Sequence, residues 1–190
     1  MKQWQDVVAL YERLGHLEYA GEGVTQWQHA WQCAQLAQRA HAKPALQAAA
    51  WLHDVGHLLD GETHTPSLRG LDDRHQVRAA VLLEPLFGAA VAQPVALHVD
   101  AKRYLVATHA NYAARLSQDS QRSLALQGGP MRVDEAEAWS RQPHAEDALR
   151  LRVWDDSAKN SAWWPASREQ ALAELSELLA RCALKKQNPL

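Results

Sequence analysis

Apolar residues recur at helical spacing along most of the chain, and no stretch shows the period-two alternation of a half-buried strand. Gly, Pro and polar residues gather in the loops predicted over 18–23 and 60–71, and 117–132 is a loop or a broken helix. The spacing predicts helices over 5–17, 26–42, 44–59, 73–86, 94–109, 133–140, 144–159 and 167–185. We therefore expect an all-α protein.

Domain organisation follows from length and from the signals at helix ends. A chain of 190 residues is expected to form one domain over 1–190, with its core at about 5–160 and a packing helix at about 167–185. Thr25 and Gln28 fit a capping box that opens one helix. Pro44 ends that helix and starts the next. The tail after the last helix is expected to fray.

Composition excludes several classes of protein. The net charge of -2 and the lack of a basic run argue against nucleic-acid binding. No apolar run approaches the ~18 residues that span a bilayer, and the N-terminus lacks the apolar centre of a signal peptide. Only two cysteines occur, Cys33 and Cys182, which indicates a reducing cytoplasm rather than a disulfide framework. The sequence carries no signal for oligomeric state.

An adjacent His-Asp pair is the most informative chemical feature. His53 and Asp54 lie inside an otherwise apolar stretch, Ala-Ala-Ala-Trp-Leu-His-Asp-Val-Gly-His, which ends at His57. Burying a carboxylate is costly unless a partner or a metal takes the charge. On a continuous helix His53 and His57 would share one face, with Asp54 turned by about 100° from His53. The pair therefore indicates a metal site.

Four further candidate ligands come from other predicted helices: His29, His75, His98 and Asp155. Helix bundles build dinuclear sites from inward-facing side chains of several helices, and a carboxylate such as Asp54 can bridge two ions ~3.5–4 Å apart. Mixed imidazole and carboxylate ligands suit iron, manganese or zinc rather than calcium or magnesium.

Each candidate has a plainer interpretation when it is taken alone. A single histidine on a helix is more often a surface or hydrogen-bonded core residue than a ligand. Asp155 alone would be a solvated charge or a cap, and physical reasoning does not choose between Asp155 and Asp156. The joint order of the six residues carries the prediction. Five other histidines are expected to be bystanders: His16, His41, His64, His109 and His144.

The order His29, His53-Asp54, Asp155 resembles the HD-domain superfamily of metal-dependent phosphohydrolases, and the added His75 and His98 resemble its dinuclear subset. Local sequences over roughly 15–160 resemble the HD-domain oxygenases that cleave the carbon–phosphorus bond of 1-hydroxyphosphonates. The stretches that carry this resemblance are Tyr19-Ala-Gly-Glu22-Gly-Val-Thr-Gln26-x-x-His29, Trp51-Leu-His53-Asp54-Val-Gly-His57, His98-Val-Asp-Ala-Lys102-Arg-Tyr104-Leu, Leu126-Gln-Gly-Gly-Pro130 and Arg152-Val-Trp-Asp155-Asp-x-Ala-Lys159.

The resemblance implies an HD-domain helical bundle with a mixed-valent Fe(II)/Fe(III) site in its core and O2 as co-substrate. Tyr19 would occupy an open iron position until substrate displaces it, and Glu22 would sense a cationic amine. One iron would be held by His29, His53, Asp54 and Asp155, and the other by His75 and His98, with Asp54 bridging. Substrate contacts would come from His57, Lys102, Ser120, Gln127 and Arg152, with Ser123 as an alternative to Ser120.

Helical spacing gives independent support to the proposed cations. A phosphonate carries about two negative charges, so its pocket should supply cations and hydroxyls. Lys102 lies one turn after His98, and Arg152 lies three residues before Asp155, so each shares a face with a candidate ligand. In isolation both would be interpreted as surface residues that extend their charged ends to solvent.

The reaction implied is oxidation of a small 1-hydroxyalkylphosphonate by O2 to a carboxylate and phosphate. Candidate substrates are 2-amino-1-hydroxyethylphosphonate, its N-trimethyl analogue and hydroxymethylphosphonate. A trimethylammonium group would require an aromatic cage. The alternative is an HD phosphohydrolase, in which a metal-bound hydroxide attacks a phosphate ester or nucleotide. A non-catalytic helical module would predict missing ligands, and none of the six is missing.

Overall fold

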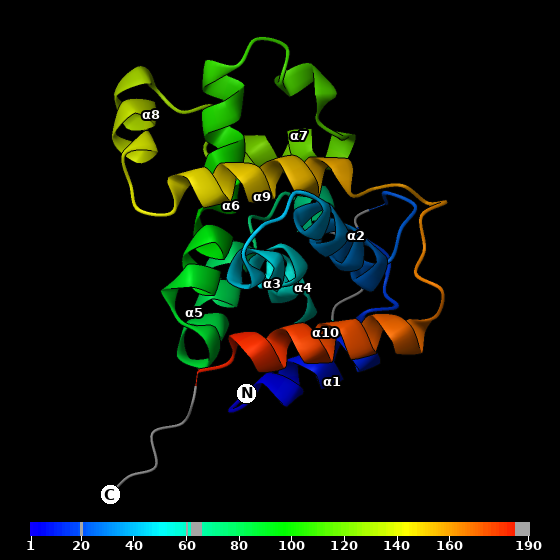
Figure 1. Ribbon diagram of the computed structural model, residues 1–190. Coiled ribbons are helices and arrows are strands. Elements are labelled where there is room, and N and C mark those ends of the chain that lie inside the picture. The colour runs from blue at the N-terminus through cyan, green and yellow to red at the C-terminus, as the bar shows by residue number, and fades with distance from the viewer. Residues whose placement is uncertain (20, 60, 62–65, 185–190) are drawn as a thin grey trace, which may run out of the picture.

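The computed structural model describes residues 1–19, 21–59, 61 and 66–184, which form helices and no strand (Figure 1). The predicted bystander His64 and the tail over 185–190 lie outside this part of the chain. The α-helices of the described part are α1 Trp4–Leu14, α2 Gln26–Arg39, α3 Pro44–Leu52, α4 Val55–Leu58, α5 His75–Phe87, α6 Ala89–Thr108, α7 Gln118–Leu126, α8 Val133–Ser140, α9 Ala145–Ser157 and α10 Arg168–Cys182. Short 3₁₀ helices cover Pro66–Arg69 and Ala113–Arg115.

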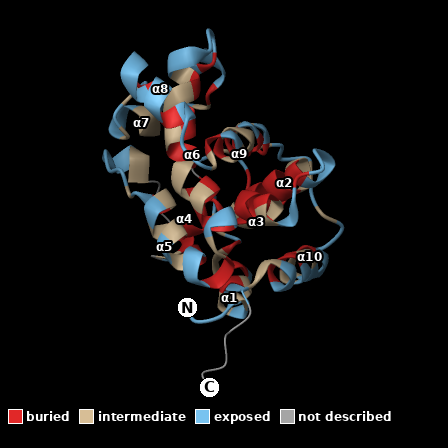
Figure 2. Ribbon diagram, turned by 60° about the vertical axis from the view of Figure 1, so that its left-hand side comes forward, coloured by how far each residue is buried: buried red, intermediate tan, exposed pale blue. Residues whose placement is uncertain are grey.

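The helices surround a central layer made by α2 and α3 (Figure 1). The long helix α6 packs against α3, α5 and α9, and α9 also packs against α2. Helices α1 and α10 lie side by side and cover one end of this layer, whereas α7 and α8 lie at the other end. Figure 2 shows that the buried residues concentrate on α2, α3 and the inner sides of α6 and α9. The all-α prediction is confirmed.

The largest hydrophobic cluster joins α1 to the centre of the molecule. Leu52 and Val55, on either side of the His-Asp pair, are completely buried in it. The Tyr11 hydroxyl donates a hydrogen bond to the Trp51 carbonyl at 2.9 Å and ties α1 to the end of α3. Among the described residues, no helix has the length and apolar character needed to cross a bilayer.

The prediction of one helix over 44–59 is wrong. Helix α3 ends at Leu52 and α4 begins at Val55, because Asp54 leaves the helical region with φ -102° and ψ 9°. A second constraint acts just after the break. The α-carbon of Gly56 packs so closely on the start of α5 that a Cβ there would lie 2.1 Å from the His75 carbonyl oxygen. The sequence pattern missed the break because the apolar residues continue through it.

The structure adds detail to three smaller predictions. Helix α6 begins at Ala89 rather than at Pro94, so the proline lies inside the helix. The segment 117–132 contains α7, whose N-cap Ser117 accepts a hydrogen bond from the Ser120 amide. Thr25 caps α2 as predicted, but the Gln28 side chain points to backbone carbonyls of 160–163 instead of closing a capping box.

Leu52→Ala should test the packing that supports the His-Asp pair. Leu52 is completely buried directly before His53, so the substitution leaves a cavity. We expect the free energy of unfolding to fall by about 2–5 kcal/mol, measured by denaturant titration. The matched control is Leu68→Ala, at a leucine that is 68% exposed. It should change stability by less than about 0.5 kcal/mol. Equal effects of the two substitutions would contradict the core assignment.

Candidate metal centre

The structure brings together all six predicted ligands, although they come from five parts of the fold. All six are buried, and none is more than 7% exposed. The break between α3 and α4 supplies two adjacent ligands, and four helices supply one each. The six residues are His29 on α2, His53 and Asp54 at the break, His75 at the start of α5, His98 on α6 and Asp155 on α9.

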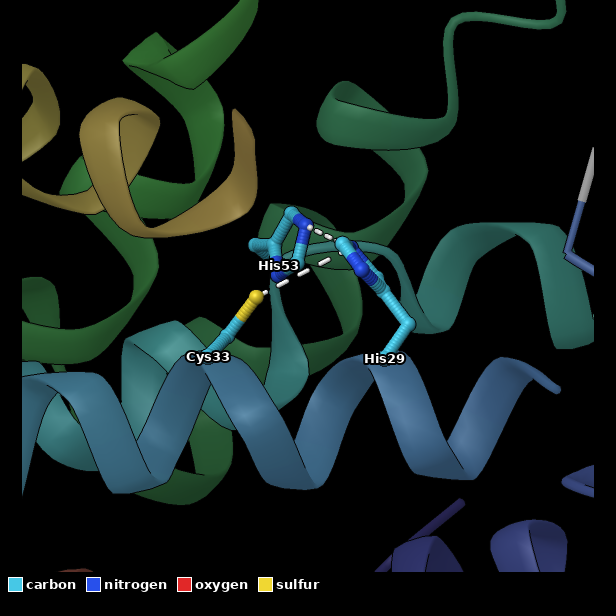
Figure 3. A group of neighbouring side chains, drawn as sticks. All are labelled: His29, Cys33 and His53. Atoms are coloured by element: carbon cyan, nitrogen blue, oxygen red, sulfur yellow. Dashed lines mark hydrogen bonds between the residues drawn. The ribbon is translucent and has the colours of Figure 1, made fainter. Parts of the chain in front are cut away.

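His29 and His53 form the first pair of imidazoles. The Nδ1 of His29 lies 2.9 Å from the Ala158 carbonyl oxygen, and the Nδ1 of His53 lies 2.9 Å from that of Ala50. Each Nδ1 must therefore carry the hydrogen, which leaves the Nε2 lone pair free. The two Nε2 atoms face each other at 3.2 Å, and the Cys33 sulfur lies 3.8 Å from that of His29 (Figure 3).

His75 and His98 repeat this arrangement. The Nδ1 of His75 lies 3.0 Å from Asp73 Oδ1, and the Nδ1 of His98 lies 2.7 Å from the Val95 carbonyl oxygen. The Nε2 atoms of the two rings again face each other at 3.2 Å. Two lone pairs at this distance repel each other unless a cation lies beside them. The donor arrangement therefore fits one metal ion at each pair.

Asp54 lies between the two pairs and turns one oxygen to each. Its Oδ2 is 3.2 Å from the Nε2 of His53 and 3.7 Å from that of His29. Its Oδ1 is 3.3 Å from the Nε2 of His75 and 3.6 Å from that of His98. One carboxylate placed in this way can bridge two ions.

Asp155 completes the first group. Its Oδ1 lies 3.4 Å from the Nε2 of His29 and 3.7 Å from that of His53, and has no hydrogen-bond partner among the described residues. A buried carboxylate oxygen without a partner is costly, and a metal ion would satisfy it. Asp156 turns instead to Arg152 and the Tyr112 hydroxyl. The geometry therefore favours Asp155 over Asp156 as a ligand.

The electrostatics keep the carboxylates ionised. Burial opposes the charge of Asp155, but the Arg152 guanidinium together with contacts from His29 and His53 holds the pKa of this carboxyl well below its usual range. Burial likewise opposes the charge of Asp54, but His53 holds its pKa low. In return the Asp54 and Asp155 carboxylates together overcome the effect of burial and raise the pKa of His53 to about 10, so its Nε2 favours a bound cation, either a proton or a metal ion that replaces the proton. Burial lowers the pKa of His98 far below its usual value, and His75 lowers it further.

A cavity opens beside this cluster. Its walls include four of the candidate ligands and all five residues predicted to contact substrate. The clustering therefore agrees with the prediction of a substrate pocket at the metal centre. The ligands on the walls are Asp54, His75, His98 and Asp155, and the predicted contacts are His57, Lys102, Ser120, Gln127 and Arg152.

Lys102 is the cation of the cavity that lacks a carboxylate partner. Its ammonium donates to the Ser123 hydroxyl at 2.8 Å and lies 3.5 Å from the Ser120 carbonyl oxygen. No ion pair within the described residues includes it. The side chain is only 2% exposed, and burial, with help from the Arg152 charge, lowers the pKa of Lys102 to about 7. Such an ammonium is suited to an incoming anion.

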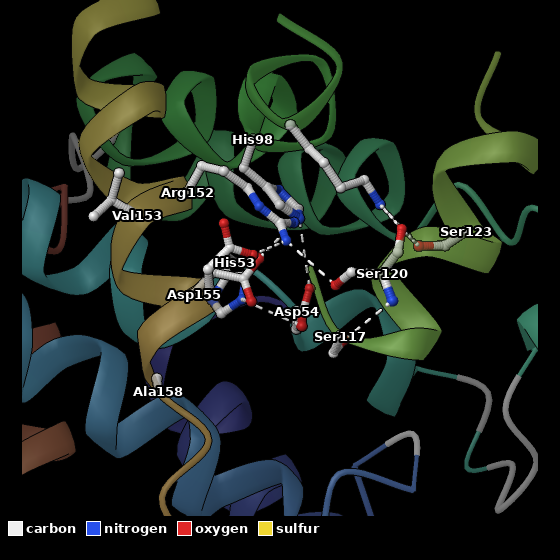
Figure 4. Close-up of polar contacts among 12 residues, drawn as sticks. His53, Asp54, His98, Ser117, Ser120, Ser123, Arg152, Val153, Asp155 and Ala158 are labelled. Atoms are coloured by element: carbon white, nitrogen blue, oxygen red, sulfur yellow. Dashed lines mark hydrogen bonds and ion pairs between the residues drawn. The ribbon is translucent and has the colours of Figure 1, made fainter. Parts of the chain in front are cut away.

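Arg152 lies between a candidate ligand and the cavity (Figure 4). Its Nη1 contacts Asp155 Oδ2 at 2.8 Å, and its Nη2 contacts the Ser120 hydroxyl at 3.4 Å as well as Asp156. Gln127 lines the same cavity and its Oε1 has no hydrogen-bond partner among the described residues. Ser120 and Ser123 both lie at the cavity, so the structure brings both of the alternative serines to it.

Of the predicted Tyr19–Glu22 pair, Tyr19 contacts the candidate ligands, whereas Glu22 forms an ion pair away from the cavity wall. The Tyr19 hydroxyl donates to Asp54 Oδ2 at 2.8 Å, and its ring stacks on His29 with centroids 3.9 Å apart. Burial, and then the Asp54 charge, raise the pKa of Tyr19 well above its usual value. Glu22 is not among the residues that line the cavity, and its carboxylate pairs with the Lys159 ammonium at 3.3 Å.

Sequence reasoning missed the residues that hold the candidate ligands in position through hydrogen bonds. Gln32 donates to the carbonyls of Asn160 and Trp163 at 2.7 and 2.8 Å, which fixes the chain just after the Ala158 carbonyl that anchors His29. Asp73 contacts two histidines at once. For Asp73 a signal existed, because a carboxylate two residues before His75 lies at the start of the same predicted helix.

Comparisons with known proteins agree with the geometry. The family model described as HD domain matches residues 27–131. The chain is 45% identical over 139 residues to hydroxymethylphosphonate dioxygenase of Gimesia maris, covering 73% of this chain and 69% of the relative. It is 36% identical over 153 residues to the glycine-betaine-forming [1-hydroxy-2-(trimethylamino)ethyl]phosphonate dioxygenase of Leisingera caerulea, covering 80% and 78%. The chain therefore belongs to the HD-domain family, in the group of the hydroxyphosphonate dioxygenases.

Proposed function

We propose that this protein is an iron-dependent dioxygenase that cleaves the carbon–phosphorus bond of hydroxymethylphosphonate, with O2 as co-substrate, to give formate and phosphate. The observation that carries the proposal is the position of Asp54 between two facing imidazole pairs, beside a buried lysine that pairs with no carboxylate among the described residues. The six predicted ligands hold a mixed-valent Fe(II)/Fe(III) pair in this proposal. The iron pair would supply the activation of O2 and the exchange of electrons with substrate.

The side chains of the cavity account for substrate binding and orientation. The Lys102 ammonium, the Arg152 Nη2 and the Ser120 hydroxyl converge on one region and supply the charge and hydrogen bonds that a phosphonate requires. His57 and Gln127 add further polar groups on the cavity wall. A phosphonate held there places its hydroxyl-bearing carbon next to the metal ligands.

The aromatic residues on the cavity walls bear on which substrate can bind. Tyr19 is the sole Phe, Trp or Tyr among the described residues on its walls, so these walls offer no aromatic cage for a trimethylammonium group. Glu22, the predicted amine sensor, pairs with Lys159 and is already neutralised. The lack of an aromatic cage disfavours a trimethylammonium substrate, and the name of the Gimesia maris relative favours a one-carbon substrate.

A hydrolytic reaction is the competing proposal, because Lys102 and Arg152 would also bind a phosphate ester. The names of the two relatives, both dioxygenases, favour the oxygenase. Oxygen consumption separates the two reactions directly, since hydrolysis releases phosphate without it.

Oxygen uptake and phosphate release should match mole for mole when the iron-loaded, partly reduced protein receives hydroxymethylphosphonate. The amino and trimethylammonio substrates should react less well. Chelation should abolish turnover and lower the melting temperature, because a metal bound only by the folded state stabilises it. Iron should restore both.

A matched pair of variants tests the role of the bridging carboxylate. Asp54→Asn removes the charge between the two imidazole pairs and should abolish turnover and weaken metal binding. Asp100→Asn, at a carboxylate that pairs with Arg103 on the outer side of α6, should leave both unchanged. Phosphate release from esters without oxygen uptake would instead establish a hydrolase.

Lys102→Met should weaken phosphonate binding and stabilise the protein. The pKa of Lys102 is about 7 in the folded chain, against 10.5 as its ordinary value, so the unfolded chain binds more protons between these values. The cost of the buried charge is therefore fully present below about pH 7 and disappears as the pH rises toward 10.5. We expect the variant to gain about 1–3 kcal/mol in acidic buffer and less in alkaline buffer, by denaturant titration.

Lys43→Met is the control for this prediction, because Lys43 is exposed at the start of α3. It should change neither binding nor stability. A Lys102→Met protein that is less stable at acidic pH would contradict the assignment of a buried ammonium without a carboxylate partner.

A further inference from the structure

Asp73 joins two histidines that serve different parts of the site. Its Oδ2 accepts a hydrogen bond from the Nδ1 of His57 at 2.7 Å, and its Oδ1 lies 3.0 Å from the Nδ1 of His75. The Oδ1 also accepts from the His75 backbone amide at 3.3 Å. His57 faces the proposed substrate, and His75 is a candidate metal ligand.

An ionised carboxylate only accepts hydrogen bonds, so both imidazoles must carry their hydrogen on Nδ1. Both Nε2 atoms are then directed into the site. That of His75 lies 3.2 Å from the Nε2 of His98, and that of His57 lies 4.0 Å from Asp54 Oδ1. The two rings tethered by Asp73 also stack, with centroids 4.0 Å apart and an angle of 27° between planes. They therefore form one packed unit.

The backbone around Asp73 is shaped to hold it there. Arg74 adopts a left-handed conformation, with φ at 51°, which costs energy for a residue with a side chain. Its amide is satisfied by the side chain of Asp72 at 3.1 Å. On the opposite side, Gly56 allows α4 to approach the His75 carbonyl. This approach sets the spacing between His57 and His75.

We propose that Asp73 is a positioning residue that fixes His57 for the phosphonate and His75 for the second metal with a single carboxylate. The inference rests on the proposed function for the identity of the anion. Hydrogen-bond acceptors behind metal-ligating histidines typically contribute about 10- to 100-fold in metal affinity or activity. Asp73 differs from the backbone carbonyls behind His53 and His98, because its second oxygen holds a side chain of the substrate pocket.

Asp73→Asn tests the proposal, because an amide offers one accepting oxygen and can satisfy only one imidazole. The apoprotein is titrated with Mn(II), and inorganic phosphate is then titrated into the metal-loaded protein. We expect one of two metal-binding steps to weaken by about 10- to 100-fold and phosphate affinity to fall as well. His57→Gln should lower phosphate affinity and leave both metal steps in place.

Two controls bound the interpretation. Asp100→Asn alters a carboxylate that pairs with Arg103 and does not line the cavity, and it should leave both titrations unchanged. Asp73→Glu keeps two accepting oxygens and should retain more metal affinity than Asp73→Asn, which also covers the case in which the asparagine variant does not fold. Wild-type metal and phosphate binding in Asp73→Asn, or equal losses in the two Asp73 variants, would overturn the proposal.

Neither titration requires turnover. A protein that fails to consume oxygen would therefore refute the proposed function and leave the role of Asp73 open to the same measurement. Conversely, an active oxygenase whose Asp73→Asn variant binds metal and phosphate normally would refute the role of Asp73 alone.

Discussion

The repulsion between facing imidazole lone pairs is the constraint on which this site depends. Backbone carbonyls hold the Nδ1 hydrogens of His29, His53 and His98, and Asp73 holds that of His75, so four lone pairs converge as two pairs at 3.2 Å. A cation at each pair, either a metal ion or a proton shared between the two Nε2 atoms, would relieve this repulsion. The packing of α2, α3, α5 and α6 against one another keeps the rings in place and resists their separation.

One break in a helix and one close contact between helices make this convergence possible. A continuous helix would turn Asp54 by about 100° from His53. The break after α3 allows both side chains to reach one centre, so that Asp54 can face both imidazole pairs. Gly56 then brings α4 against the start of α5 and sets the position of His75. The helix break at His53 and Asp54 is held in place by Leu52 and Val55, which lie on either side of it and are completely buried.

Apolar spacing predicted the all-α fold. The order of the histidines and aspartates, together with the family resemblance, predicted the six side chains that cluster and the nearby Lys102 and Arg152. They were insufficient wherever the answer depended on contacts between distant segments. The helix break was invisible because apolar spacing continues through it. The Glu22–Lys159 ion pair joins residues 137 positions apart, so no local sequence pattern could predict it. A physical choice between Asp155 and Asp156 likewise required the fold, because only the fold shows that Asp155 Oδ1 faces His29 and His53.

The two cations of the cavity differ in a way that constrains what binds. Arg152 already contacts two carboxylates, so most of its charge is balanced within the protein. Within the described part of the chain, the partners of Lys102 are a hydroxyl and a carbonyl. The anionic group of a ligand should therefore lie nearest to Lys102. Because His98 lies one turn away on the same helix, a ligand that also reaches the metals needs a second donor atom within a few bonds of that anion. A hydroxyl and a phosphonate on the same carbon meet this requirement.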